Sequence, residues 1–253
     1  MQSLISIITP VLNAADTVQQ TLDSVAKYCP PDTEHIVVDG GSTDGTLQIL
    51  QQSDAILIHQ DKPGLSAAMN QGLSHARGRY ILLLNADDFL MPDVQGILIN
   101  LPIRPADNTV YYCDILQRDE KSGLEIPCRA NIDHINKYMS VYHPGLIVPR
   151  AVYDVVGLYS EEFELAMDSE WVHRCLASGI SFRYVDGVSA TMRLGGRSHV
   201  SLGASLAEYR RSVTQHKVTP GHIASYYFVR QLGLQTLLKF RPFRSFWLSM
   251  RGV

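Results

Sequence analysis

The chain has 253 residues and a mass of 28.2 kDa, which suits one large domain or a domain with an appended C-terminal segment. Hydrophobic residues make up 45% of the sequence and charged residues 19%, as is usual for a globular protein with a substantial core. The net charge of −3 and the isoelectric point near 6.3 give no reason to expect nucleic acid as a partner.

Cysteine spacing and the N-terminal residues bear on the cellular compartment. The cysteines form neither CxxC pairs nor zinc-type clusters, so we interpret them as reduced core thiols. They are Cys29, Cys113, Cys128 and Cys175. The first residues lack the basic leader of a signal peptide, and no apolar run reaches the roughly 18 residues of a spanning helix. We therefore expect a cytoplasmic protein, with the inner face of the membrane as an alternative.

Short β-rich runs alternate with stretches of helical periodicity in the first third of the chain. The predicted strands are residues 4–9, 35–38, 55–59 and 80–84. The predicted helices are residues 15–27, a segment through 47–50, and residues 66–76. Strands that alternate with helices at this spacing predict an α/β fold with a parallel sheet and crossover helices.

Polar residues follow three of these predicted strands. They form residues 9–13, 39–44 and 85–88. Parallel sheets bind ligands at the carboxyl ends of their strands. This coincidence predicts a nucleotide-type site at that edge of the sheet.

The rest of the chain is less regular. Strands are predicted at 109–116 and 143–148, a polar hairpin turn at 118–123, and a helix at 168–177. We divide the chain into a domain of residues 1–205 and a basic, aromatic helical extension of residues 206–253. The extension has two interpretations: packing on the domain or on a second subunit of a homo-oligomer, or peripheral contact with an anionic membrane.

Two adjacent carboxylates, Asp87 and Asp88, follow the predicted strand that ends at residue 84. Adjacent carboxylates are costly at a strand end unless water or a cation neutralises them. An oxygen-only ligand set suits Mg²⁺ or Mn²⁺, which would bridge a diphosphate. The alternative is a solvated turn, but the position after a buried strand favours the metal site.

Asp39 and the segment that begins at Lys62 are candidates for nucleotide binding. The Asp39 carboxylate could accept an N–H from a base such as uracil or thymine, or it could form the turn before two glycines. Lys62 and Gly64 precede a helix start, where backbone N–H groups suit a diphosphate. The segment lacks the Gly-Lys-Ser/Thr ending of nucleotide hydrolases.

Asp168 begins a predicted amphipathic helix. It is either the helix N-cap or the general base that takes the proton of an acceptor hydroxyl. His143, before Pro144, either lines an acceptor cleft or is structural. The histidines form no HExxH cluster, which excludes the common zinc hydrolases.

Together these segments resemble glycosyltransferase family 2, with its type A glycosyltransferase fold. The segments that carry the resemblance are Ser6-Ile-Ile-Thr-Pro-Val-Leu-Asn13, Val37-Val-Asp-Gly-Gly-Ser-Thr-Asp-Gly-Thr46, residues 61–72, 76–80 and 84–88, and Met167-Asp-Ser-Glu-Trp171. The resemblance implies a Rossmann-like, mixed but mostly parallel central sheet flanked by helices.

The resemblance also implies roles for individual residues. The base and ribose would be held by Thr9, Pro10, Val11, Asn13 and Asp39. The diphosphate or donor sugar would lie near Lys62, Gly64 and Asn70, with Ala86 and Asp87 in the donor-binding motif. Asp87 and Asp88 would hold Mg²⁺ or Mn²⁺, and Asp168 would be the catalytic base. Asn85 and Met167 depart from the family pattern, which has an acidic residue at each position.

The function expected from this resemblance is inverting sugar transfer from a nucleotide-diphosphate donor. UDP or dTDP donors are favoured over GDP. The acceptor would be a saccharide or lipid-linked saccharide in cell-surface polysaccharide or glycoconjugate synthesis, selected by residues 101–142. The alternative is a catalytically inactive sugar-nucleotide-binding or assembly subunit of the same fold. A nucleotidyltransferase would want a basic glycine-rich loop after the first strand, and residues 13–16 do not provide one.

Overall fold

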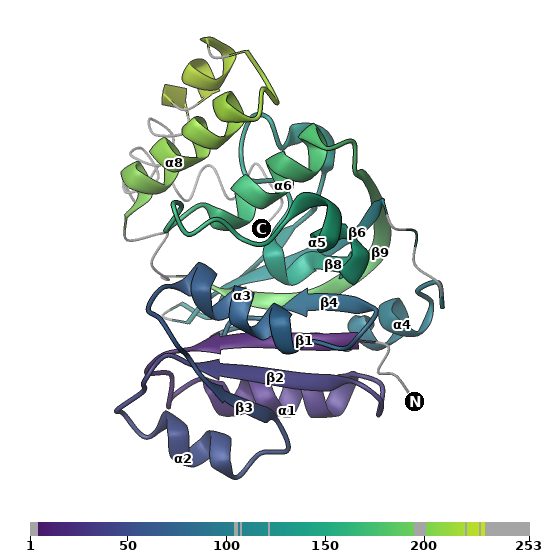
Figure 1. Ribbon diagram of the computed structural model, residues 1–253, viewed down its shortest axis with the longest axis vertical. Helices are drawn as coiled ribbons and strands as arrows, with labels where there is room; N and C mark the ends of the chain where they lie inside the picture. The colour runs from purple at the N-terminus through teal and green to yellow at the C-terminus, as the bar shows by residue number, and fades with distance from the viewer. Residues whose placement is uncertain are drawn as a thin grey trace.

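A computed structural model describes residues 5–103, 106, 108–120, 122–194, 201–220, 222–227 and 229–230 (Figure 1). Those residues form a sheet with helices on both faces. Figure 1 shows the N-terminal strands at one end of this sheet and the later strands stacked beyond them.

The sheet has nine strands in the described part of the chain, in the order β3-β2-β1-β4-β8-β6-β9-β5, with β7 paired to β6. The first four along the chain are parallel: β1 (Ile5–Val11), β2 (Glu34–Asp39), β3 (Ile56–His59) and β4 (Tyr80–Leu83). The others are β5 (Phe89–Leu90), β6 (Thr109–Asp119), β7 (Leu124–Cys128), β8 (Leu146–Pro149) and β9 (Ser181–Arg193). β8 runs antiparallel to both β4 and β6, while β6 and β9 are parallel. The sheet is therefore mixed and mostly parallel, as predicted.

Helices cover both faces of the sheet. The α-helices are α1 (Val18–Tyr28), α2 (Thr46–Gln51), α3 (Leu65–His75), α4 (Asp93–Ile99), α5 (Arg150–Val156), α6 (Met167–Ala177) and α8 (Leu202–Gln215). Short 3₁₀ helices η1 (Ile132–His134) and η2 (His143–Gly145) lie before β8. In β1, Ile8 belongs to the hydrophobic cluster that includes Met69 of α3 and Trp171 of α6, whereas Ile7 belongs to the cluster that includes Val94 of α4. This alternation buries β1 on both faces and explains its continuous apolar run.

The elements predicted in the first third are confirmed with small shifts at their ends. The later predictions need one correction. The strand predicted at 143–148 starts only at Leu146, because the residues before it form η2 around Pro144, which lacks a backbone N–H. The strand predicted at 109–116 is confirmed as β6, which continues to Asp119, and the hairpin turn predicted at 118–123 connects β6 to β7, with Gly123 at φ +67°.

Helix α8 lies beside α6 (Figure 1). It begins at Leu202, so the predicted boundary between residues 205 and 206 falls inside a helix. The basic and aromatic residues 231–253 lie outside the described residues. No helix in the described part of the chain is long and apolar enough to cross a membrane. The four cysteines are free thiols, with Cys113 and Cys175 buried.

Candidate active site

The loops that follow β1 and β2 are fastened to each other. The backbone N–H of Asn13 donates to Ser42 Oγ at 2.9 Å, and its side-chain Oδ1 accepts from the Thr43 N–H at 2.8 Å. Asn13 has φ +52°, a left-handed conformation that asparagine tolerates better than most residues. The Ala14 N–H donates to Thr46 Oγ1 at 2.8 Å. These contacts give the predicted nucleotide edge a fixed backbone.

Asp39 forms the turn at the end of β2. Its carboxylate is 1% exposed and accepts the N–H groups of Gly41 at 3.0 Å and of Ser42 at 3.2 Å. Gly40 lies close to the side chain of Gln60, and a Cβ atom at position 40 would be 2.9 Å from Gln60 Oε1. The turn-forming interpretation of Asp39 is therefore observed. A carboxylate has about four acceptor sites, so a further N–H from a ligand remains compatible with the turn.

The side chains of the other β1 candidates face the interior. Thr9 is fully buried and its Oγ1 lies 2.9 Å from His35 Nε2. Burial lowers the pKa of His35 to about 4, which keeps its imidazole neutral. Pro10 is buried, and Val11 packs in a cluster with residues of α1. The sequence prediction omitted the next residue, Leu12, which is 59% exposed and offers the apolar surface at this loop.

The donor-side candidates on and before α3 have partners within the chain. Lys62 is exposed and pairs with Glu161, Nζ to Oε1 at 2.7 Å. Gly64 precedes α3 with φ +115°, which favours glycine. The amide of Asn70 donates to the Tyr159 carbonyl at 2.8 Å and accepts from the Tyr159 N–H at 2.9 Å. Asn70 therefore joins α3 to the segment before α6.

Thr17, the N-cap residue of α1, and Thr21 within α1 hold the turn that carries Asp87 and Asp88. The Ala86 carbonyl accepts hydrogen bonds from Thr17 Oγ1 at 2.9 Å and Thr21 Oγ1 at 3.0 Å. The Asp88 carbonyl also accepts from Thr21 Oγ1, at 2.6 Å. Through these bonds α1 fixes the position of both carboxylates.

Asp88 is a buried carboxylate with one oxygen in use. Its Oδ1 accepts the backbone N–H of Arg193 at 3.0 Å, while Oδ2 has no hydrogen-bond partner among the described residues. Burial, with repulsion from Asp87 second, raises the pKa of Asp88 to about 7. A nearby cation would reverse this shift, because it favours the ionised form.

The chemistry of this turn fits a metal ion that is bound partly by protein carboxylates and partly by oxygens of a substrate. Among the described residues no group of three or more His, Cys, Asp or Glu side chains is arranged to enclose an ion. Mg²⁺ is commonly held by one or two carboxylates together with phosphate oxygens and water. Asp87 and the unpartnered Oδ2 of Asp88 could supply those carboxylate oxygens.

Asp168 lies in the first turn of α6 and is not its N-cap. The N-cap is Ala166, so the predicted capping role of Asp168 is wrong. Oδ1 of Asp168 accepts the N–H of Ser169 at 2.7 Å, and its side chain is 22% exposed. The carboxylate is thus fixed on one side and open to solvent.

His143 lies between the two carboxyl groups. Its Nε2 is 3.7 Å from Asp88 Oδ2 and its Nδ1 is 3.8 Å from Asp168 Oδ2. Burial alone would lower the pKa of His143, but contact with Asp168 and the charge of Asp88 outweigh burial and raise it. Gly145 fixes the approach of η2, since a Cβ atom there would be 2.7 Å from the Cys113 carbonyl.

Arg193, at the end of β9, is a site residue that the sequence prediction missed. Besides its backbone bond to Asp88, its guanidinium donates to the Asp87 carbonyl and to Glu120 Oε1, the latter at 2.7 Å. It also lies over the Phe89 ring, 5.5 Å from the centroid. The strand that carries Arg193 was not predicted, so no signal connected it with the carboxylates.

Two relatives have names that describe glycosyltransferases. The PGL/p-HBAD biosynthesis glycosyltransferase of Mycobacterium tuberculosis (strain ATCC 25177 / H37Ra) is 28% identical over 205 residues, which is 78% of this chain and 79% of the relative. The putative teichuronic acid biosynthesis glycosyltransferase TuaG of Bacillus subtilis is 43% identical over 91 residues, 34% of this chain and 36% of TuaG.

Two solved structures share the fold. S. aureus TarS 1-349 in complex with UDP-GlcNAc matches with a TM-score of 0.66 and 19% identity, over 92% of this chain and 72% of that one. The mannosyltransferase PcManGT from Pyrobaculum calidifontis, in complex with GDP-Man and Mn²⁺, matches with a TM-score of 0.65 and 15% identity, over 100% of this chain and 85% of that one. Against a longer TarS chain the match covers 41% of its length.

The predicted type A glycosyltransferase fold is thereby confirmed. The family model described as Glycosyl transferase family 2 matches residues 6–138, more than half of the 253 residues. The chain belongs to glycosyl transferase family 2.

Proposed function

We propose that this chain transfers a sugar, with inversion, from a nucleotide-diphosphate donor to an acceptor hydroxyl. The observation that carries the proposal is the position of one imidazole. His143 lies within 3.7 Å of Asp88 Oδ2 and 3.8 Å of Asp168 Oδ2. Residues predicted for the leaving group and for the acceptor therefore face each other around a single side chain.

Asp168 acts as the general base in this proposal. Direct displacement needs a base on the acceptor side and a stabilised leaving group on the other side. The Ser169 N–H holds Oδ1 of Asp168, and the side chain is partly exposed, so an acceptor hydroxyl can reach it. The proton passes from that hydroxyl to the Asp168 carboxylate while the acceptor oxygen attacks the anomeric carbon and the bond from this carbon to the nucleoside diphosphate breaks.

Asp87 and Asp88 hold a divalent cation in this proposal, Mg²⁺ or Mn²⁺. When bound there, the cation would offset the negative charge on the departing nucleoside diphosphate. The unpartnered Oδ2 of Asp88 supports this assignment. So does the Mn²⁺ in the PcManGT complex, which has the same fold.

UDP or dTDP donors are favoured because Asp39 can accept an imide N–H of uracil or thymine. The structural neighbours include a UDP-GlcNAc complex and a GDP-Man complex, so they are compatible with either class of donor. Binding would fall to Asp39, the loop at Asn13 and the exposed Leu12 for the nucleoside. Lys62 and Gly64 would lie toward the diphosphate.

The names of the relatives support a class of acceptor. Their names refer to teichuronic acid and to PGL/p-HBAD biosynthesis. We propose an acceptor that belongs to a cell-surface polysaccharide or glycoconjugate.

Calorimetry with a panel of nucleotide sugars, each with and without Mn²⁺, tests the proposal. Metal-dependent, base-selective binding is the expected result, and it would identify the nucleotide. Binding without release of nucleoside diphosphate, across a broad acceptor panel, would favour the inactive sugar-nucleotide-binding subunit instead. Absence of binding to every member would contradict the assignments of Asp39 and Asp87 together.

A further inference from the structure

Helix α8 contacts the segment that leads into Asp168. The carboxylate of Glu208 accepts three consecutive backbone N–H groups, from Glu164 at 3.2 Å, Leu165 at 2.9 Å and Ala166 at 3.0 Å. The last of these is the N-cap residue of α6, and its own side chain makes no capping bond. Glu208 therefore anchors, from another helix, the N-cap residue of α6 and the two residues before it.

The position of the Glu208 carboxylate, next to the N-terminal end of α6, is electrostatically favourable. The first N–H groups of a helix have no partner within the helix, and the helix dipole favours a negative charge near them. Glu208 satisfies N–H groups at this end while Asp168 lies only two residues past Ala166. A change in the Glu208 contacts therefore reaches the start of α6 directly.

Arg211, one turn along α8, holds the same segment at its other end. Its guanidinium donates to the Glu162 carbonyl at 2.6 Å and lies 3.9 Å from the centroid of the Phe163 ring. Glu208 accepts hydrogen bonds from backbone N–H groups, whereas Arg211 donates a hydrogen bond to a backbone carbonyl. The segment 162–166 is therefore held through both kinds of backbone group.

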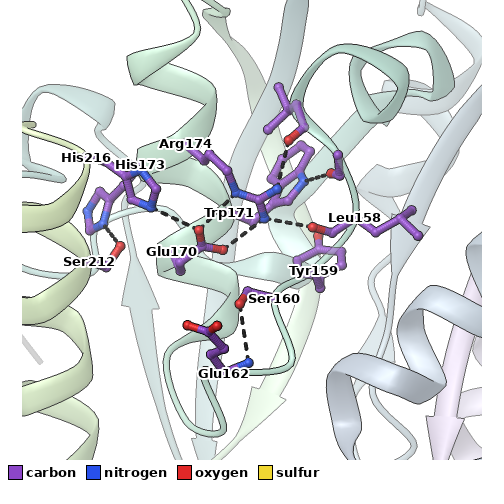
Figure 2. A network of polar contacts seen from close by, with 12 residues as sticks. Leu158, Tyr159, Ser160, Glu162, Glu170, Trp171, His173, Arg174, Ser212 and His216 are labelled. Carbon is purple, nitrogen blue, oxygen red and sulfur yellow. Dashed lines mark hydrogen bonds and ion pairs between the residues drawn. The ribbon is translucent and has the colours of Figure 1, made fainter.

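The register of α8 against α6 is fixed by separate contacts. Ser212 Oγ bonds His173 Nδ1 at 2.8 Å, and His216 Nε2 lies 3.0 Å from Glu170 Oε1 (Figure 2). These contacts fix the position of α8 relative to α6, and they therefore fix the position of Glu208 at the start of α6.

We propose that Glu208 is a positioning residue for sugar transfer: through the three N–H groups of residues 164–166 it holds Asp168 in reach of the acceptor hydroxyl. The inference rests on the proposed function, since it takes Asp168 as the base. It gives a catalytic task to a helix that follows the segment matched by the family model.

The test compares Glu208→Ala, Glu208→Gln and Tyr209→Phe in the full chain. Tyr209→Phe is the matched control. It removes the hydrogen bond that the Tyr209 hydroxyl of α8 donates to the Ile135 carbonyl, and Ile135 lies outside the segment that leads into Asp168. Hydrogen exchange of residues 164–168 is measured by mass spectrometry without any donor. Glu208→Ala should accelerate that exchange about tenfold, since the amides lose their acceptor, and Tyr209→Phe should leave it unchanged.

The second readout is release of nucleoside diphosphate from UDP-glucose, UDP-N-acetylglucosamine, dTDP-rhamnose and GDP-mannose with Mn²⁺. Glu208→Ala should lower kcat roughly tenfold to a hundredfold with an unchanged donor KM, because a displacement of the base of about 1 Å is enough for such a loss. Glu208→Gln, which keeps one acceptor oxygen, should fall between Glu208→Ala and the wild type.

The outcomes separate this inference from the function on which it rests. Equal kcat for Glu208→Ala and Tyr209→Phe, with Asp168→Asn inactive, would overturn the inference and leave the function standing. Unchanged exchange at residues 164–168 would also overturn it. If the wild-type chain releases no nucleoside diphosphate, the proposed function fails, and exchange alone decides whether Glu208 orders the start of α6.

Discussion

Nδ1 of His143 lies 3.8 Å from Oδ2 of Asp168, and the opposite nitrogen of the ring faces Asp88. The imidazole is the group in the described residues that lies between these two carboxyl groups. Its two nitrogens are on opposite sides of the ring, so it can interact with both carboxylates at once. This arrangement couples the two sides of the proposed reaction.

His143→Gln should lower kcat for transfer roughly tenfold, since an amide presents its N–H donors at one end and cannot face both carboxylates. Steady-state kinetics with a donor identified by calorimetry measures the change. His75→Gln, at an exposed position on α3, is the control and should match the wild type. An unchanged kcat for His143→Gln would remove His143 from the mechanism.

Asp168→Asn and Asp87→Ala should both abolish transfer but differ in donor binding. Asn at 168 keeps the shape of the side chain and loses its basicity, so the donor should bind as before. Ala at 87 removes a proposed metal ligand, so Mn²⁺-dependent binding should weaken as well. Calorimetry and product assays on the same preparations separate the two. Near-normal turnover of Asp168→Asn would show that another group is the base.

The strands β1, β2 and β4 could be predicted because buried parallel strands are short, continuous apolar runs. β9 could not, because Asp186 and Gly187 interrupt its apolar residues, and Gly187 has φ +127°. Its register against β6 also shifts at this point, which no local pattern announces.

The individual segments of the site could be predicted from the sequence. How these segments come together in space could not be predicted. Asp88 and Asp168 were recognised from their motifs, while His143 had both a structural and a functional interpretation. What brings them together is the antiparallel insertion of β8 beside β4, which places η2 next to the turn at Asp88. The contacts of Glu208 could not be predicted, because a sequence does not distinguish a solvated acidic residue on a basic amphipathic helix from one that binds backbone N–H groups.

Gly145→Ala should destabilise the fold by about 1–3 kcal/mol and lower activity, because the new Cβ would overlap a backbone carbonyl. That contact is 2.7 Å to the oxygen of Cys113, and relieving it shifts η2 with His143. Urea unfolding measures the change in the free energy of unfolding.

Gly96→Ala on α4 is the control for this substitution. Its Cβ would meet nothing within 4 Å, so the helix should gain about 0.5–1 kcal/mol. Equal free energies of unfolding for Gly145→Ala and the wild type would mean that η2 accommodates a side chain there.

Stability should fall as the pH drops from about 6.5 to 4, partly because of His173. Burial lowers the pKa of His173 to about 4, below the ordinary 6.5 that it regains on unfolding. The unfolded chain therefore binds the proton first, and the contribution of the neutral ring is full above pH 6.5 and lost through pH 4. The shift corresponds to roughly 3 kcal/mol.

The matched measurement is urea unfolding of the wild type and His173→Asn at pH 7.5, 5.5 and 4.5. The difference between the two proteins should shrink as the pH falls, since only the wild type loses this contribution. A difference that stays constant with pH would show that His173 does not titrate as its burial requires.

Glu170 is a buried carboxylate of α6, and removing it should lower the stability of the protein. It is 2% exposed and pairs with Arg174 through two bonds of 2.9 Å, with His216 on the same carboxylate (Figure 2). Arg174 also donates to the carbonyls of Val156 and Leu158, so its guanidinium is fixed in place. Removing one partner of such a buried pair leaves a charge without compensation, which costs about 3–5 kcal/mol.

Glu170→Ala should therefore lower the free energy of unfolding by about 3–5 kcal/mol, measured by urea denaturation. His216→Gln breaks only the outer contact of the network, and it should cost about 1 kcal/mol. The double variant Glu170→Leu with Arg174→Met should be more stable than Glu170→Ala, because it removes both charges together. If Glu170→Ala cost no more than His216→Gln, the ion pair between Glu170 and Arg174 would contribute no more to stability than the outer contact with His216.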